Sequence, residues 1–405
     1  MARPASRVCS VKVTGPLAPF VDACRAELKD RGYASLTSVN ELRQLARLSC
    51  WLEQSRLPVG SLTRERVERF VGEQRAQGRG AYCSLQGLLV LLEVLRRLGA
   101  IEAERPTPPG SPTDVVLASF EEYLVGERGL AASTAAAYVA RARRFLDGRS
   151  SDDRLAGLTA GEVTQAVLRE SQRASARSAQ YFVAALRSFL RFCFIEGLVG
   201  TDLSRAALAI TARRSSPLPF GISRADAKTL LGGCDRRQAI GRRDYAVILT
   251  LLRLGLRASE VAVLTLDGID WRAAEIVVVG KGGRCDRVPL PADVGTAIAS
   301  YLRRGRPACG RREVFLRALA PIGPLGRGGV STIVRRACRN AGLPEVGAHR
   351  LRHTAACEMV SAGVSLQHAG QVLRHRSPIS TAIYARVDIE RLRLLAQPWP
   401  EDAQR

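Results

Sequence analysis

Two proline-bearing stretches divide this chain of 405 residues. Residues 105–113, RPTPPGSPT, are too rich in proline and glycine for a helix or a central strand, and TARRSSPLPFG at 211–221 forms a second interruption. Elsewhere apolar residues mostly recur every three to four positions, which is typical of amphipathic helices packed in small domains. We therefore expect a module at 1–104, a linker at 105–113, a helical domain at 114–210, a linker at 211–221 and a C-terminal domain at 222–405.

The first two modules can be aligned with each other. Residues SCWLEQS lie beside RRFLDGR, and LTRERVERFV lies beside LTAGEVTQAV, at a nearly constant offset. Each module is expected to contain four helices, so the first module is a possible duplicate of the second. Amphipathic helices in small bundles also resemble one another without common origin, and both explanations stay open.

The C-terminal domain is expected to be mostly helical with one small sheet. RRDYAVILTLLRLG reads as a buried helix closed by Gly255, and LRASEVAVLTLDGID, residues 256–270, reads as a further helix. EIVVV and RCDRVPL are β-rich runs joined by GKGG, which predicts a hairpin with Lys281 at its tip. The fold class expected is mainly α, with a mixed α+β C-terminal domain.

All four histidines lie in one short segment, residues 347–386. His349, Arg352 and His353 are spaced so that they share one face of a helix. Beyond them we expect a helix ending near His375, a turn at Ser377-Pro378, and a helix that carries Tyr384. Imidazoles, a guanidinium and a phenol in one segment favour proton chemistry or the binding of an anion.

The charge of the chain favours a polyanionic partner. Its formal net charge is +23 and its pI is near 10.6, and 57 of its 61 basic residues are arginine. Part of the arginine excess is equally well explained by genomic base composition, but the sign of the charge does not depend on that choice.

Ten cysteines are scattered singly, without a C-x-x-C pair. This pattern is typical of reduced thiols in a cytoplasmic protein and indicates neither a disulfide framework nor a zinc site. The N-terminal residues lack the apolar run of a signal peptide, and charged residues interrupt the longest apolar stretches, so no membrane span is expected.

Six residues, taken in order, resemble the tyrosine recombinase, or phage integrase, family. They are Arg257 in GLRASE, Lys281 in the hairpin, His349 and Arg352 in HRLRH, His375 in LRH, and Tyr384 nine residues on. The resemblance covers residues 217–390, and the module at 112–210 is similar to the helical, SAM-like core-binding domain of that family. It implies the fold of the DNA breaking-rejoining enzymes, with helical DNA-binding modules before a catalytic domain.

The resemblance also implies a reaction. A site-specific recombinase of this kind cleaves and rejoins double-stranded DNA through a 3′-phosphotyrosyl intermediate, as in the integration, excision or transposition of a mobile element. Neither a metal nor a nucleotide cofactor is required, because the bond energy is kept in the ester. The roles implied are Tyr384 as nucleophile, Arg257 and Arg352 as phosphate ligands, Lys281 as general acid, His349 as base, and His375 as a donor to the phosphate.

Further residues have open interpretations. Glu260 either holds a catalytic guanidinium or buffers a basic loop, and His353 either supports the site or is an ordinary core histidine. His368 is more simply explained as a structural or exposed histidine, and Arg287 as a strand-end arginine that touches phosphate or solvent. Arg374 stands where the family commonly has glycine, which tightens the turn or adds a phosphate contact.

The family likeness also suggests partners. A homo-tetramer on two DNA sites is expected, with residues 385–405 docking on a neighbouring subunit, and with other recombinases or accessory proteins as further candidates. A nucleoid-associated, cytoplasmic protein would fit. The role of residues 1–104 stays open.

Other classes of function also fit parts of the pattern. A type IB topoisomerase would use a very similar catalytic set, and a non-catalytic DNA-binding protein would only grip phosphates with it. A plain helical scaffold would show no salt-sensitive DNA binding.

Overall fold

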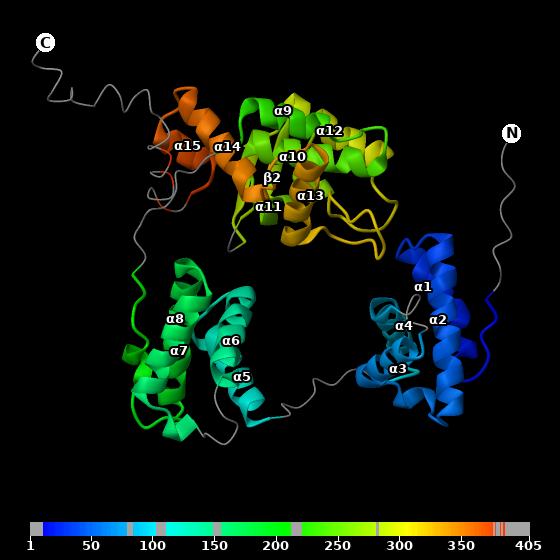
Figure 1. The fold of residues 1–405 in the computed structure, drawn as a ribbon. Coiled ribbons are helices and arrows are strands. Elements are labelled where there is room, and N and C mark those ends of the chain that lie inside the picture. Colours follow the sequence, from blue (N-terminus) through cyan, green and yellow to red (C-terminus); the bar gives the residue numbers. More distant parts are fainter. Residues whose placement is uncertain are drawn as a thin grey trace, which may run out of the picture. The chain divides into compact units, whose positions relative to one another are not determined.

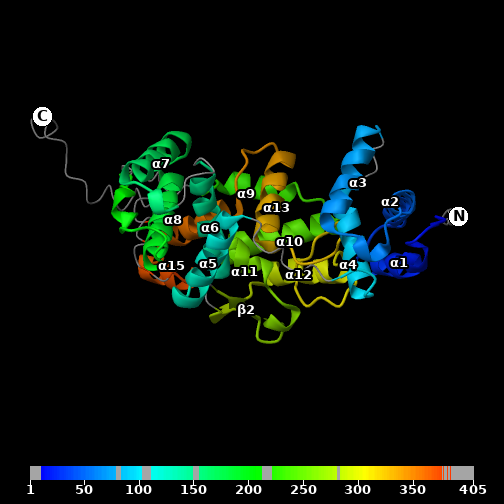
Figure 2. The same ribbon diagram turned by 90° about the horizontal axis from the view of Figure 1, so that it is seen from below.

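The computed structural model describes residues 11–78, 84–102, 111–148, 155–211, 221–280 and 283–375, and residues 377, 381 and 384. The chain forms two compact units, one comprising Glu104–Ser215 and the other Met1–Ala103 with Ser216–Arg405. Figures 1 and 2 show the elements of both units. We describe each unit by itself.

The described residues between 11 and 102 form four α-helices around their own apolar cluster. These are α1 (Val21–Asp30), α2 (Ser35–Gln54), α3 (Arg64–Ala76) and α4 (Leu85–Arg97). Leu45, Phe70 and Leu91 are among the buried side chains of the cluster. Side-chain hydroxyls cap the N-termini of α3 and α4. Thr63 accepts a hydrogen bond from the backbone N of Arg66, and Ser84 accepts one from the backbone N of Gly87. The helices predicted in this module are confirmed.

The unit at Glu104–Ser215 is also a bundle of helices. Its elements in the described residues are α5 (Pro112–Glu122), continued by a π-helical turn at Tyr123–Glu127, α6 (Ala132–Asp147), α7 (Ala160–Arg173) and α8 (Ala176–Ile195). Aromatic side chains of α8 fill the core, and the rings of Phe120 and Phe189 meet edge to face with centroids 5.2 Å apart. The four helices predicted here are confirmed, whereas the duplication stays a prediction.

The C-terminal part combines helices with one small sheet. Its helices are α9 (Arg224–Gly232), α10 (Ala239–Leu254), α11 (Ala258–Ala262), α12 (Ala292–Arg304), α13 (Gly326–Asn340), α14 (Ala348–Ser361) and α15 (Leu366–Val372). Its strands are β1 (Ile269–Asp270), β2 (Glu275–Val279) and β3 (Cys285–Pro289), antiparallel in the order β1-β2-β3. The β2–β3 hairpin confirms the strands predicted on either side of GKGG, although Lys281 itself lies outside the described residues.

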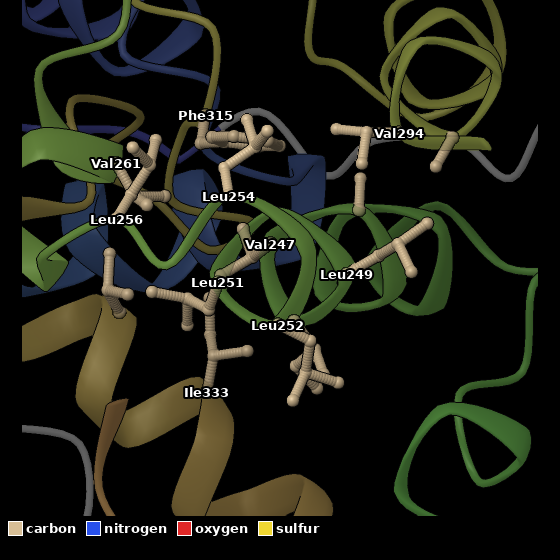
Figure 3. Close-up of a cluster of buried hydrophobic side chains, with 14 of the residues drawn as sticks. Val247, Leu249, Leu251, Leu252, Leu254, Leu256, Val261, Val294, Phe315 and Ile333 are labelled. Carbon is tan, nitrogen blue, oxygen red and sulfur yellow. The ribbon is translucent and has the colours of Figure 1, made fainter. Parts of the chain in front are cut away.

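Helix α10 is the centre of this core. It packs against α12, α13 and α14, and Figure 3 shows its apolar side chains meeting those of neighbouring elements. Leu251 and Val247 are fully buried, as are Val294 of α12 and Phe315 of a loop. Each such side chain contributes about 1.5–3 kcal/mol by leaving water. Ten of the sixteen residues of α10 are buried, because neighbouring elements cover this helix on several sides.

The prediction of one helix over residues 256–270 is wrong, because the helix found there is much shorter. Helix α11 ends at Ala262, and the chain then pairs with a distant loop instead. The backbone N of Val314 donates to the Leu264 carbonyl, and that of Leu266 donates to the Arg312 carbonyl, both at 2.8 Å. Tertiary pairing has therefore replaced the local helical hydrogen bonds that the apolar spacing favoured.

Helices α14 and α15 carry the histidine segment. They pack on each other, and α14 also packs on α10. Helix α15 ends at Val372, close to the predicted end near His375, while Pro378 and most of the predicted Tyr384 helix lie outside the described residues. Among the helices of the described residues, none is both long enough and apolar enough to cross a lipid bilayer.

Candidate active site

Glu260, near the start of α11, is the carboxylate around which a cluster of arginines gathers. Glu260 is 1% exposed, and its carboxylate accepts hydrogen bonds from the backbone N of Arg257 at 2.8 Å and from Nη1 of Arg257 at 2.6 Å. Arg374 Nη2 donates to the same carboxylate at 2.8 Å, and Arg352 Nη1 lies 3.9 Å from it. Burial raises the pKa of Glu260, but the bond from the Arg257 backbone and the nearby guanidinium groups outweigh it and hold the pKa below its usual value.

Arg352 reaches this cluster from α14. The residue is 2% exposed, and its guanidinium donates to two main-chain carbonyls, that of Gly255 at 2.6 Å and that of Leu373. These bonds connect the end of α10 with the end of α15. Burial, and then the charge of Arg257, lower the pKa of Arg352 to about 10, so the side chain remains charged at neutral pH.

Arg257 is the more accessible of the two predicted phosphate ligands. Its side chain is 38% exposed, and its Nη2 donates to the Arg374 carbonyl at 3.2 Å. Together with the hydrogen bond from Nη1 to Glu260, this second hydrogen bond fixes the plane of the Arg257 guanidinium. A rigid, partly exposed fork of this kind is suited to two oxygens of a phosphate.

Tyr384 is buried beside His353 of α14. The residue is 1% exposed and packs in an apolar cluster with Ala356, Val360 and Leu373. His353 Nδ1 lies 2.7 Å from the phenol oxygen. Burial raises the pKa of Tyr384 to about 12, so the phenol is neutral at pH 7 and can donate this hydrogen bond to the Nδ1 of a neutral imidazole.

The imidazoles of His349 and His353 lie against each other. Their ring centroids are 4.3 Å apart at an interplanar angle of 67°. Burial, and then the neighbouring His349, lower the pKa of His353 to about 4, so its ring is neutral and Nδ1 can accept from Tyr384. Partial burial and the charges of Arg352 and Arg257 likewise lower the pKa of His349.

His375 approaches Tyr384 from the other end of the segment. Its ring is nearly parallel to the phenol, with an interplanar angle of 5° and centroids 6.3 Å apart, and its Nδ1 lies 2.7 Å from Thr381 Oγ1. Burial, and then the charges of Arg352 and Arg257, lower the pKa of His375 to about 4. If the Thr381 hydroxyl donates to Nδ1, the proton of the neutral ring sits on Nε2 and is free to be donated elsewhere.

Most of the site residues expected from the sequence therefore come together. Arg257 and Arg352 share one carboxylate, while His353 and His375 both adjoin Tyr384, and His349 adjoins His353. The imidazole in contact with the phenol is that of His353, whereas His349, the expected base, reaches it only through His353. Lys281 lies outside the described residues.

Two residues outside the expected catalytic set lie at the surface. His368 is exposed and bonds its neighbour Ser365, and Arg287 is 68% exposed on its side chain and pairs with Glu275. Sequence reasoning missed Thr381, since a threonine in a polar segment carries no distinctive signal. It also left open whether Arg374 points inward, although the unusual arginine was a visible sign.

Comparisons with known proteins place these features in one family. The profile described as Phage integrase family matches residues 222–391, and the one described as Phage integrase, N-terminal SAM-like domain matches residues 117–197. A protein of Sinorhizobium fredii named as integrase/recombinase y4rA is 40% identical over 96% of this chain and 96% of its own length. Tyrosine recombinase XerD of Mycobacterium tuberculosis is 31% identical over 68% of this chain and 94% of its own length.

Solved structures agree on the fold. A lambda integrase tetramer bound to a Holliday junction matches with a TM-score of 0.54 and 17% identity, over 73% of this chain and 85% of that chain. The chain thus belongs to the phage integrase family of tyrosine recombinases, and it is a tyrosine-type site-specific recombinase. The mainly α fold with a small antiparallel sheet, as expected, is confirmed.

Proposed function

We propose that this protein cleaves and rejoins double-stranded DNA at specific sites through a 3′-phosphotyrosyl intermediate on Tyr384. The observation that carries the proposal is that Arg257 and Arg352 gather at the Glu260 carboxylate while His353 and His375 lie beside the phenol of Tyr384. The related lambda integrase is bound to DNA in its solved structure, which supports DNA as the substrate. Relatives named as integrases support a role in moving a genetic element.

Phosphate binding is the first proposed step. Two guanidinium groups around one carboxylate leave a net positive charge, which attracts a DNA phosphate and later stabilises the charge of the transition state. Arg257 is partly exposed and meets the phosphate first. Arg352 lies deeper and is held by two carbonyls, so its position does not depend on the substrate.

Movement of Tyr384 is the second step. A phenol in a residue that is 1% exposed cannot reach a phosphate on a duplex, so the segment carrying it must turn outward before attack. In the buried arrangement, the phenol oxygen lies 2.7 Å from His353 Nδ1, which can accept its proton in a hydrogen bond. We assign His353 as the partner of the resting phenol, and His349 as the base once Tyr384 has turned toward the phosphate.

Strand cleavage is the third step. The phenol oxygen bonds to phosphorus while the bond from phosphorus to the 5′ oxygen breaks, and that oxygen takes up a proton. Lys281 is the proposed source of the proton, and the Nε2 of His375 the proposed donor to a phosphate oxygen. Attack by a 5′-hydroxyl reverses these steps and rejoins a strand, so the reaction as written uses no cofactor.

The organisation of the whole protein is also part of the proposal. We propose a module at 1–104, a core-binding domain at 114–210 and a catalytic domain at 222–405, with linkers between them. The separate apolar clusters of these three parts support the division. A tetramer on two DNA sites, linked by residues 385–405 and assisted by accessory proteins, is the proposed assembly.

A nicked suicide substrate tests the proposed chemistry. Cleavage near the nick releases a short fragment and traps the enzyme on the DNA, so the wild-type protein should form a covalent adduct with members of a random-site library. Tyr384→Phe should form none, because it lacks the attacking oxygen. Tyr181→Phe is the matched control, since it removes an exposed phenol of α8 and leaves that of Tyr384 in place, so it should still form the adduct.

Each result separates the proposal from its alternatives. An adduct that persists in Tyr384→Phe, or DNA binding without any adduct, would refute the assignment of the nucleophile or of cleavage. Relaxation of supercoiled plasmid without any sequence preference would indicate a topoisomerase instead. The sequences recovered from trapped DNA would identify the target.

A further inference from the structure

Arg374 occupies a backbone position that favours glycine. Its φ is +54°, in the left-handed region, directly after α15. The backbone N of His375 donates to the Gly370 carbonyl and that of Arg374 to the Gln371 carbonyl, both at 2.9 Å, which is the Schellman pattern of a helix end. This turn directs the chain from α15 toward His375. An arginine here costs backbone free energy that a glycine would not.

The side chain of Arg374 turns into the active site. It is 10% exposed, and besides the bond to Glu260 its Nη1 donates to the Val372 carbonyl at 3.1 Å. Among the described residues, its buried Nε has no hydrogen-bond partner. A strained backbone and an unpaired buried donor are both unfavourable for stability, so a role in the site explains this residue better than a role in folding.

Arg374 contacts both partners of the pair formed by Arg257 and Glu260. Its guanidinium donates to Glu260 Oε2, while its carbonyl accepts from Arg257 Nη2. Glu260 closes the ring by accepting from Arg257 Nη1. Loss of the Arg374 guanidinium would leave Glu260 free to turn toward Arg352, 3.9 Å away, and to carry Arg257 with it.

We propose that Arg374 is a positioning residue for strand cleavage, which holds the Glu260 carboxylate and, through it, the guanidinium of Arg257 in the orientation that meets the phosphate. This inference rests on the proposed function of the site and extends it to a residue outside the expected catalytic set. Arg374 acts through its neighbours, so its loss should affect the rate of cleavage more than the affinity for DNA.

Arg374→Gly separates the side chain from the turn. Glycine suits the left-handed backbone, so this variant should fold at least as well as the wild type and lack only the guanidinium. The single-turnover rate of adduct formation on the suicide substrate should fall about 10- to 100-fold, with little change in noncovalent affinity for the same DNA. Arg374→Lys should restore part of the rate, because an ammonium group can still reach Glu260.

Arg56→Gly is the matched control. Arg56 is also an arginine in the left-handed region, with φ +53°, but it is exposed in the first module. The same substitution there should leave the adduct rate unchanged. An adduct rate in Arg374→Gly equal to that of the wild type would overturn the inference, and so would equal losses in rate and affinity, since these would indicate a direct phosphate ligand.

A cycle of unfolding measurements tests the contact without DNA. The shifts in urea midpoint caused by Arg374→Gly and Glu260→Gln should not be additive, because each removes the same ion pair. Additive shifts would overturn the inference even if both rates fell. Absence of any adduct with the wild-type protein would instead refute the proposed function, and the cycle would still decide whether Arg374 holds Glu260.

Discussion

At the scale of single residues, Glu260 explains how three guanidinium groups can lie together. Like charges at such distances repel, and a buried charge without a partner is costly. One carboxylate bonded to Arg257 and Arg374, and 3.9 Å from Arg352, offsets part of that repulsion while leaving the set positive. Of the two interpretations left open for Glu260, its contacts favour the holding of a catalytic guanidinium.

The histidines of the site predict how stability depends on pH. His353 and His375 have folded-state pKa values of about 4, below the ordinary value of 6.5. A depressed histidine pKa means that the unfolded chain binds protons more readily than the folded chain. The free energy of unfolding should therefore have its full value above pH 6.5 and fall as the pH drops toward 4. Full burial would make this loss at most roughly 3 kcal/mol per residue, and partial exposure reduces it.

Urea unfolding at a series of pH values checks this expectation. His353→Gln should remove part of the slope between pH 6.5 and 4, since glutamine does not titrate there. The wild-type protein, measured at the same pH values, is the reference for this slope. A wild-type stability that is constant over this window would contradict the pKa values.

At the scale of elements, the site depends on how helices end. Gly255 closes α10 with φ +57° and offers its carbonyl to Arg352. A Cβ at this position would lie 2.7 Å from Leu373 Cδ2, at the end of α15. Two helix ends and one guanidinium thus meet at a point where only a glycine leaves enough space.

Gly255→Ala should therefore be costly. The left-handed backbone contributes about 1–2 kcal/mol of destabilisation, and crowding of Leu373 contributes about 1–3 kcal/mol more. Gly99→Ala is the matched control, because Gly99 follows α4 with φ +69° and has no atom within 4 Å of an added Cβ. Urea unfolding should show a clearly larger loss for Gly255→Ala, and equal losses would mean that Leu373 gives way without cost.

At the scale of the whole molecule, the dominant property is charge. A net charge of +23 attracts DNA over a distance set by the ionic strength. Each phosphate neutralised by an arginine releases counterions from the duplex, so affinity becomes a steep function of salt.

The affinity for duplex DNA should fall steeply between 50 and 200 mM salt. A protein with six to ten phosphate contacts loses about a thousand- to a hundred-thousandfold over this range. Fluorescence anisotropy with a labelled duplex at several salt concentrations measures the slope. A slope near zero would contradict phosphate contacts as the source of affinity and would favour the scaffold interpretation.

Periodicity predicted most of the elements, because helices such as α2, α4 and α10 depend on local spacing and caps that a single sequence displays. It failed after Ala262, where the chain exchanges local hydrogen bonds for pairing with residues 312–314. No local pattern carries information on such a distant partner. The same limit applies to Thr381, because no local pattern displays its contact with His375.

The sequence alone determined the class of fold and the sign of the charge, since these follow from periodicity and composition, and its resemblance to the tyrosine recombinases implied which residues could carry out phosphoryl transfer. Only the tertiary structure decided that His353 rather than His349 touches Tyr384, that the phenol rests buried, and that Arg374 turns inward to Glu260. These features depend on contacts between side chains that are far apart in the sequence. They depend on how α11, α14 and α15 pack, which no single stretch of sequence specifies.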